Sequence, residues 1–139
     1  MWIYKGQPIT EDDIPETAFG FIYEIHDNET GRSYIGKKFL TKASSKQVKG
    51  KRIKTRKKSD WEIYWGSCKE LVDLVAEKGE DSFTREILEF CPARGATNYR
   101  EAKVQFERNV LEEKLPSGQW RYFNGIINVR IGRRAAGIS

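Results

Sequence analysis

The feature that most constrains the fold is a strand–turn–strand pattern near the start of the chain. Residues 20–25 are rich in aromatic and β-branched side chains, and residues 33–36 resume the same extended character. Between them, residues 27–31 have the polar and glycine composition of a turn. The pattern predicts a β-hairpin, and therefore a sheet that contains an antiparallel pair of strands.

A helix and a further strand are expected after this hairpin. Ser67 and Glu70 have the spacing of a capping box, apolar side chains follow at helical spacing, and Gly79 is a suitable C-terminal stop. Residues 83–90 have the composition of a strand. Together with the hairpin, these elements predict one α/β unit.

A second helix is expected nearer the C-terminus. It begins at Thr97 or Asn98, runs towards Glu113 with an apolar stripe, and is broken by the Pro-Ser-Gly sequence at 116–118. Residues 125–131 are expected to form either a short strand or a packed coil.

Length and composition exclude several classes of protein. The chain has 139 residues, which predicts a single domain over residues 1–139. Cys68 and Cys91 are far apart and His26 is the only histidine, which excludes structural zinc, haem attachment, a disulfide scaffold and a histidine-based nucleophilic triad. No apolar run approaches about 20 residues and no signal peptide is visible, so we expect no membrane and a reduced, cytoplasmic compartment.

Residues 37–58 form a strongly basic tract, the basic arm. The arm holds 11 of the 25 Lys and Arg residues and none of the 20 acidic ones. Its Gly, Ser and Thr content predicts a loop or a mobile arm. Its charge favours a polyanion as partner, because each cation placed on a phosphate releases counterions. The alternative is a solvated loop that only keeps the protein in solution. A short basic tail, residues 130–139, closes the chain.

Two short motifs within the hairpin carry a resemblance to a known family. Gly20 and Tyr23 delimit the first motif, and Tyr34 and Gly36 delimit the second, with an interval of eleven between the two tyrosines. This arrangement resembles the signature of the GIY-YIG nuclease family.

Further features follow in the order typical of that family. A Tyr-Trp-Gly-Ser sequence precedes the first expected helix, residues 78–87 resemble the family's passage from helix to third strand, and a later helix carries Glu101. The resemblance covers residues 2–131 and is strongest to small phage-type members. It implies an α/β (α+β) fold in which a three-stranded antiparallel sheet is flanked by helices, with the basic arm inserted.

The resemblance also implies a metal-dependent phosphodiesterase. Tyr23 would orient or deprotonate the attacking water, and Tyr34 would bind phosphate or water. The ordinary pKa of tyrosine, about 10, is too high for a base at neutral pH, so Lys37, Lys38 and a metal ion would have to lower it. Gly36 has no Cβ, so a phosphate could approach its backbone closely. The alternative for the tyrosines is ordinary aromatic packing within a sheet.

Glu101 matches the metal-binding glutamate of the family. The implied cofactor is Mg²⁺ or Mn²⁺, without any small-molecule cofactor. One carboxylate suffices because Mg²⁺ keeps several waters and takes oxygens from a substrate phosphate. The alternative is structural, because Asn98 and Glu101 also have the spacing of a capping box.

The sequence departs from the family where an arginine is expected to grip the phosphate. That position falls on Ser44, inside the basic arm. Lys38, which shares strand parity with the second tyrosine, is expected to take this role, with Arg56 in reserve.

Two further departures concern a histidine and an asparagine. No histidine stands near the start of the first helix, which favours a tyrosine-based mechanism in which Tyr64 is either a third hydroxyl or a core residue. Asn124 and Asn128 compete for the family's late asparagine. Asn128 is preferred on its local sequence.

The sequence therefore predicts an endonuclease that hydrolyses double-stranded DNA, with homing-like site choice or specificity for a branch or nick. The oligomeric state is left open, and a phage-encoded protein would act in the host cytoplasm. The alternative is a non-catalytic nucleic-acid-binding protein that retains the fold. The residues expected to contact nucleic acid are Gly36, Lys37, Lys42, Lys49, Lys51, Arg52, Lys54, Arg56, Lys57 and Lys58.

Overall fold

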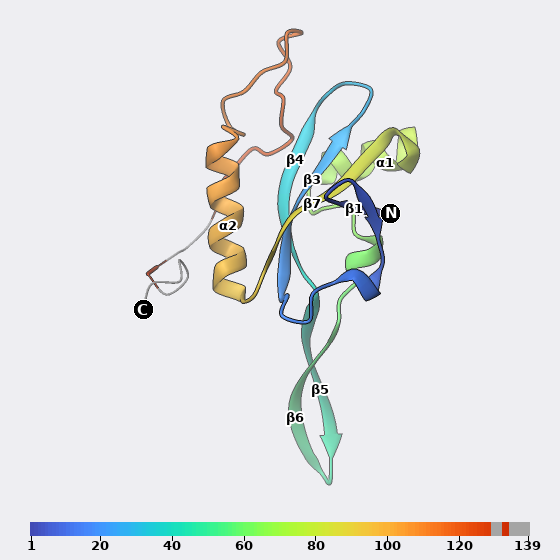
Figure 1. Ribbon diagram of the computed structural model, residues 1–139, viewed down its shortest axis with the longest axis vertical. Helices are drawn as coiled ribbons and strands as arrows, with labels where there is room; N and C mark the ends of the chain where they lie inside the picture. Colours follow the sequence, from blue (N-terminus) through green and yellow to red (C-terminus); the bar gives the residue numbers. More distant parts are fainter. Residues whose placement is uncertain (129–131, 134–139) are drawn as a thin grey trace.

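The structure, a computed structural model, describes residues 1–128 and 132–133, apart from the side chains of Lys46, Ile53 and Lys54. Its centre is a five-stranded sheet in the order β2-β1-β7-β3-β4 (Figure 1). The strands are β1 (Trp2–Tyr4), β2 (Gln7–Ile9), β3 (Gly20–Asp27), β4 (Ser33–Phe39) and β7 (Phe83–Cys91). The expected three-stranded antiparallel unit is present as β7-β3-β4. It is extended by β1, which runs parallel to β7, and by β2. Three-residue strands are too short to show a periodic pattern in the sequence.

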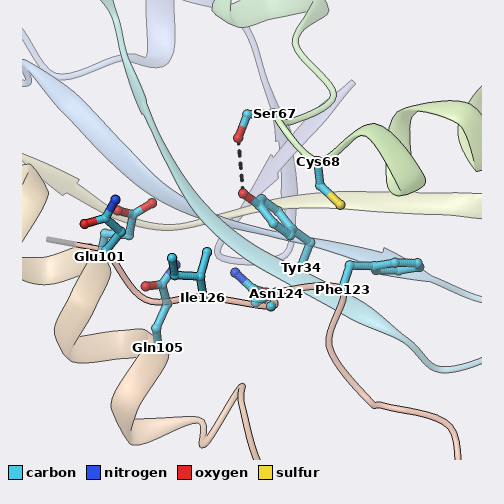
Figure 2. A pocket seen from close by; sticks show the side chains of 10 residues that line it. Tyr34, Ser67, Cys68, Glu101, Gln105, Phe123, Asn124 and Ile126 are labelled. Carbon is cyan, nitrogen blue, oxygen red and sulfur yellow. Dashed lines mark hydrogen bonds between the residues drawn. The ribbon is translucent and has the colours of Figure 1, made fainter.

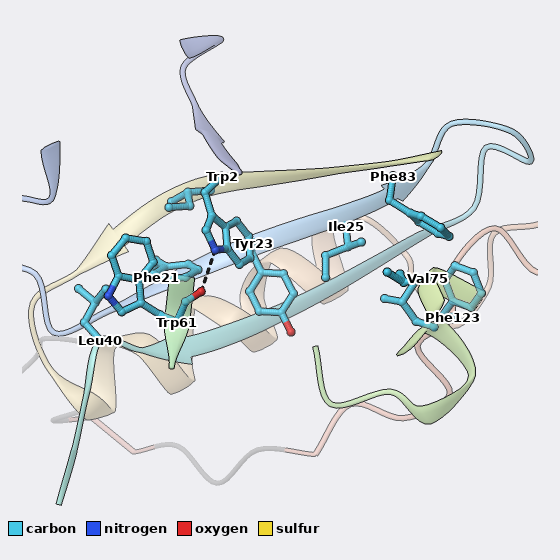
Figure 3. Packing of buried hydrophobic residues seen from close by; sticks show 11 residues of the cluster. Trp2, Phe21, Tyr23, Ile25, Leu40, Trp61, Val75, Phe83 and Phe123 are labelled. Carbon is cyan, nitrogen blue, oxygen red and sulfur yellow. Dashed lines mark hydrogen bonds between the residues drawn. The ribbon is translucent and has the colours of Figure 1, made fainter. Parts of the chain in front are cut away.

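The two faces of the sheet bury different sets of side chains. Because side chains alternate along a strand, Phe21, Tyr23 and Ile25 of β3 lie on one face and Ile22 on the other. The first face packs against Trp2, Trp61 and helix α1, as Figure 3 shows for part of this cluster. The second face packs against helix α2. The central hairpin is therefore covered from both sides, which fixes its register.

Helix α1 (Lys69–Lys78) is present where expected, and it ends at Gly79, whose φ of 95° suits a glycine. The expected capping box is wrong. Within the described residues, no side chain caps the N-terminus of α1 at Cys68. The Ser67 hydroxyl instead bonds to Tyr34, and Glu70 forms an ion pair with Arg32 at 3.2 Å. Both side chains have found tertiary partners in place of the helix's own N–H groups.

Helix α2 (Arg94–Glu107) begins and ends earlier than the sequence suggests. It starts after Ala93, whose carbonyl accepts a 2.7 Å hydrogen bond from the Thr97 hydroxyl. Asn98 and Glu101 both lie inside the helix, so their expected capping box is wrong. This position rules out the capping role for Glu101, whose carboxylate pairs with Lys37 instead.

The basic arm is a regular β-hairpin, so the expectation of a loop is wrong. Strands β5 (Thr41–Val48) and β6 (Lys51–Lys58) pair along their whole length and project from the body of the molecule (Figure 1). The turn residues Lys49 and Gly50 have φ values of 51° and 77°. Two successive positive φ values characterise the type I′ turn, whose twist matches that of the two strands. We call this hairpin the ribbon.

The segment after α2 returns to the free edge of β4. Ser33 donates its N–H to the carbonyl of Arg121, and Phe123 donates to the carbonyl of Ser33, both at 2.8 Å. Residues 125–128 form no strand, while 129–131 and most of the basic tail, including Arg130 and Arg134, lie outside the described residues. Among the described residues, no helix combines the length and apolar composition needed to cross a membrane.

Candidate active site

The two motif tyrosines lie on the same face of the central hairpin. Tyr23 pairs with Gly36 across β3 and β4, and Tyr34 pairs with Ile25, so the phenols are diagonal neighbours. Their ring centroids are 6.2 Å apart. The strand period and the short turn thus bring the two side chains together as the sequence predicted.

Gly36 has a different role from the one expected. A Cβ at this position would lie 2.5 Å from the hydroxyl oxygen of Tyr23 and 2.9 Å from the Tyr34 ring. The space above Gly36 is therefore filled by the tyrosine pair rather than left open to a phosphate. The glycine is required because the phenol of Tyr23 crosses over it.

A cavity of about 400 Å³ surrounds the outer edge of β4 (Figure 2). Tyr34 lines it from one face of the sheet, and Glu101 and Gln105 line it from α2 on the other. The Tyr34 and Ser67 hydroxyls lie 3.2 Å apart and share a hydrogen bond. Tyr23 is 1% exposed and does not line the cavity. The structure therefore brings Tyr34 and Glu101 to one cavity, with Tyr23 buried next to Tyr34.

The Glu101 carboxylate is held at the cavity by α2 and by Lys37. Its side chain is 15% exposed, and Lys37 Nζ donates to Oε1 at 3.3 Å. Burial raises the pKa of Glu101 above its ordinary value, although the charge and hydrogen bond of Lys37 oppose the rise. Lys37 is therefore the ion-pair partner of the carboxylate.

Both motif tyrosines are kept neutral by their surroundings. Burial raises the pKa of Tyr23 well above 10, and the neighbouring phenols Tyr64 and Tyr34 add to the rise. Burial also raises the pKa of Tyr34, against the opposing effect of the Ser67 hydrogen bond. Lys37 is paired with Glu101 on the other face of the sheet, and neither Lys37 nor Lys38 lowers the pKa of Tyr23; the expected lowering by these lysines together with a metal ion stays a prediction.

Lys38 lies in a second hollow, beside the Tyr34 cavity. Its Nζ is 2.6 Å from Asp60 and 4.0 Å from the centroid of the Tyr64 ring. This hollow, about 330 Å³, is also lined by Arg56 and Arg94. Lys38 shares its strand face with Tyr34 as expected, but it does not line the same cavity. Arg94 was missed, because only the fold brings the start of α2 to the base of the ribbon.

The structure separates the two competing asparagines. Asn124 is buried, and its side chain bonds the backbone of Ile35: Oδ1 accepts from the N–H at 3.0 Å and Nδ2 donates to the carbonyl at 2.8 Å. Gln105 also donates to the Ile35 carbonyl, at 3.0 Å. Asn124 therefore closes the edge of β4, while Asn128 is exposed on the lining of the cavity.

Gln105 was missed by sequence reasoning, although a signal for it exists. Residues four apart lie on the same face of a helix, so Glu101 at the site places Gln105 there too.

The oxygen donors of the cavity fit a hard divalent cation. They are the Glu101 carboxylate, the Tyr34 and Ser67 hydroxyls and the Asn128 amide oxygen. Residues 1–128 and 132–133 contain no cluster of three or more His, Cys, Asp or Glu that could hold a metal. Glu101 would therefore be the carboxylate ligand, with water and substrate oxygens completing the shell, as Mg²⁺ allows.

The cations of the ribbon divide into two groups. At its base, Arg56 donates to the Thr41 hydroxyl and carbonyl at 2.7 and 2.8 Å, and Lys58 pairs with Glu11 and Glu62. Five other cations, two near the base and three near the turn, are exposed and form no ion pair within the described part of the chain. They are Lys42, Lys49, Lys51, Arg52 and Lys57. The side chain of Lys54 lies outside the described residues.

A mixed sheet whose central hairpin pairs two tyrosines on one face, with a glutamate of helix α2 on the other face, defines a class of nuclease domain. The family model described as "Putative endonuclease segE, GIY-YIG domain" matches residues 2–127, so the chain belongs to the GIY-YIG nuclease family. No curated protein and no solved structure matches it. Membership confirms the expected fold class and indicates an endonuclease domain that acts on DNA and, like the family in general, depends on a divalent metal.

Proposed function

We propose that the protein is a metal-dependent endonuclease that hydrolyses phosphodiester bonds of double-stranded DNA at the cavity on the edge of β4. The observation that carries this proposal is the convergence of Tyr34 and Glu101 on one cavity from opposite faces of the sheet. The ribbon supports it, because its exposed cations begin where β4 ends and suit a phosphate backbone.

Glu101 would hold the divalent cation, Mg²⁺ or Mn²⁺, with Lys37 keeping the carboxylate in place. Such an ion lowers the pKa of bound water and stabilises the negative charge that develops on a phosphate. The Lys37 ammonium favours the ionised form of Glu101, which is the form that binds metal. The protein's contribution at this point is to present one carboxylate at a fixed place.

The tyrosines would act as neutral hydrogen-bond donors. The Tyr34 hydroxyl, oriented by Ser67, is placed to donate to a phosphate oxygen or to the attacking water. Tyr23 keeps its proton at neutral pH and packs beside Tyr34 on the same face, so its proposed role is orientation rather than deprotonation. Asn128 could add an amide donor at the rim, and the Lys38 ammonium could contact an adjacent phosphate.

The test is the conversion of supercoiled plasmid to nicked or linear DNA, in Mg²⁺, in Mn²⁺ and in EDTA. We expect cleavage that EDTA abolishes and that Glu101→Gln reduces by at least about 100-fold, with DNA binding retained. The matched control is Glu107→Gln, an exposed glutamate on the same helix.

Cleavage that persists in EDTA or in Glu101→Gln would overturn the proposed site. A gel shift without cleavage by any form would favour the alternative, a non-catalytic nucleic-acid-binding protein with this fold. Nicked, branched and intact duplexes used side by side would separate structure-directed cleavage from homing-like site choice.

A further inference from the structure

The ribbon is more regular than phosphate contact alone requires. All eight cross-strand pairs are in register, from Thr41 opposite Lys58 to Val48 opposite Lys51. An isolated two-stranded hairpin is marginally stable in water. Here its base is fixed to the body, since Arg56 lies over Phe19, 4.8 Å from the ring centroid, and Lys58 pairs with Glu11 and Glu62. The result is a defined, projecting element rather than a flexible arm.

One face of the ribbon combines uncharged residues of β5 with basic residues of β6. Opposed residues of an antiparallel pair point to the same side, so Gln47 shares a face with Arg52, and Ala43 with Arg56. Ser45 lies on the same face of β5. This face therefore presents small or amide side chains on one strand and cations on the other, and Gln47 and Arg52 are its pair nearest the turn. Lys42, Lys51 and Lys57 lie on the opposite face.

A two-stranded ribbon with these side chains matches the major groove of B-form DNA. That groove is about 12 Å wide and admits a two-stranded ribbon, whereas the minor groove is about 6 Å wide. Near the turn, Gln47 and Arg52 are cross-strand partners, and both are exposed. Glutamine pairs with the edge of adenine and arginine with the edge of guanine in this groove. The deep, narrow major groove of an RNA duplex does not admit such side chains.

We propose that the ribbon β5–β6 enters the major groove of B-form DNA, where Gln47 and Arg52 contact base edges and Lys42, Lys51 and Lys57 contact flanking phosphates. The proposal rests on the proposed function only in taking DNA as the substrate. An eight-residue strand spans about 26 Å, so the bases read would lie within about one helical turn of the cleaved bond.

The experiment is selection of bound duplexes from a random-sequence library by the full chain carrying Glu101→Gln, which separates binding from cleavage. We expect a short enriched motif containing a guanine. Adding Arg52→Ala should reduce discrimination at that guanine by about 5- to 150-fold. Arg52→Lys should give a partial loss while keeping the charge, because the single ammonium of lysine lacks the rigid planar fork of the guanidinium. Because Arg52→Lys keeps the charge, a loss of discrimination in this variant cannot come from unfolding of the ribbon caused by removal of the charge.

The matched control is Lys57→Ala, which should weaken binding to all sequences alike and reduce the salt dependence, as a slope of log affinity against log salt, by about 1. Methylation of guanine N7, which lies in the major groove, should block binding to the selected site. A minor-groove ligand such as distamycin should leave binding intact.

The proposal is overturned if no motif is enriched, if Arg52→Lys retains full discrimination, or if distamycin displaces the protein while N7 methylation has no effect. A protein that reads a motif through the major groove but never nicks plasmid would overturn the proposed function alone. A protein that nicks plasmid without reading this groove would overturn only the role of the ribbon.

Discussion

The body of the molecule and the ribbon use their charged side chains in opposite ways. In the body, several charges are paired and partly or fully buried: Asp27 with Lys78, Glu24 with Arg108, Glu89 with Arg100, and Glu101 with Lys37. In the ribbon, five exposed cations form no ion pair within the described residues, and two of them, Lys42 and Lys57, lie opposite each other across the strands. The body can therefore hold a carboxylate in place before any ligand arrives, whereas the ribbon needs an anionic partner to relieve its own repulsion.

The comparison also separates stability from binding. Changes in the body should alter folding or cleavage and leave DNA affinity nearly unchanged. Changes to the unpaired cations of the ribbon should alter DNA affinity and leave folding nearly unchanged. The five predictions below test this division.

The largest effect on stability is expected at Asp27, whose side chain is 1% exposed and whose two carboxylate oxygens accept from Lys78 at 2.8 and 2.9 Å. Asp27→Asn removes the charge-assisted hydrogen bonds from Lys78, which keeps only Glu29 at 3.6 Å, so the free energy of unfolding should fall by about 1.5–3 kcal/mol. Denaturant unfolding at pH 7 measures this. Asp73→Asn, which breaks the exposed pair with Lys69, is the control and should be nearly neutral.

The same ion pair predicts a pH dependence. Burial tends to raise the pKa of Asp27, but hydrogen bonds from Lys78 and from the backbone of Glu29 and Thr30 together hold it below 3.8. Its stabilising contribution is therefore complete above the ordinary aspartate value and is lost as the pH falls through the lowered pKa. Asp27→Asn should flatten the acid limb of stability. An unchanged acid limb would contradict this assignment.

The next effect is expected at Gly36. Gly36→Ala would place a Cβ 2.5 Å from the Tyr23 hydroxyl, so we expect a loss of about 1–3 kcal/mol through overpacking, with reduced cleavage. Thermal unfolding and plasmid nicking measure the two consequences. At Gly125 a Cβ meets nothing within 4 Å, so Gly125→Ala should leave stability unchanged. Equal stability of the two variants would show that Tyr23 can move aside.

Replacing Lys42, Lys51 and Lys57 together by alanine should change the stability of the fold little and weaken DNA binding clearly. Each lost phosphate contact reduces the slope of log affinity against log salt by about 0.9. The slope measured for the triple variant should therefore be smaller by about 2.7. Thermal unfolding should change little. The control replaces three exposed lysines of the body, Lys5, Lys103 and Lys114. A similar fall in the slope for both variants would remove the distinction between the ribbon and the body.

The smallest effect is expected at Lys57 alone. Like charges directly opposite in a sheet are destabilising, so Lys57→Thr should stabilise the ribbon by about 0.2–1 kcal/mol at low salt. Amide hydrogen exchange within the ribbon measures this gain, which should diminish at high salt. Lys51→Thr is the control, because Lys51 lies opposite the uncharged Val48. An equal gain in both variants would point to strand propensity instead of charge.

The sequence predicted the elements whose pattern is local and strong. The strands around Tyr23 and Tyr34 follow from their composition and the turn between them, and the period of two then places both phenols on one face. The ribbon was missed because its lysine and serine content is typical of a loop. Lys49 and Gly50 nevertheless carry a turn signal that a search for a hairpin could use.

The features that the sequence could not supply depend on competition between distant partners. Ser67 has the right spacing to cap α1, but the Tyr34 hydroxyl, 33 residues away in sequence, takes its hydrogen bond. The role of Asn124 depends on the backbone of Ile35, which only the folded chain brings to it. Arg94 reaches the hollow beside Lys38 for the same reason. The proposed catalytic roles of Tyr23, Tyr34, Lys38, Glu101 and Asn128 stay predictions.

The bonds that Asn124 makes to Ile35 have a consequence for self-association. Its amide occupies the donor and the acceptor that a neighbouring strand would use, and the chain around Arg121 and Phe123 occupies those of Ser33. A second copy of the protein cannot add its own strand to β4 at these positions. The β4 edge is therefore closed to strand pairing with a second copy of the protein at Ser33 and Ile35, while the cavity beside it stays open to a substrate.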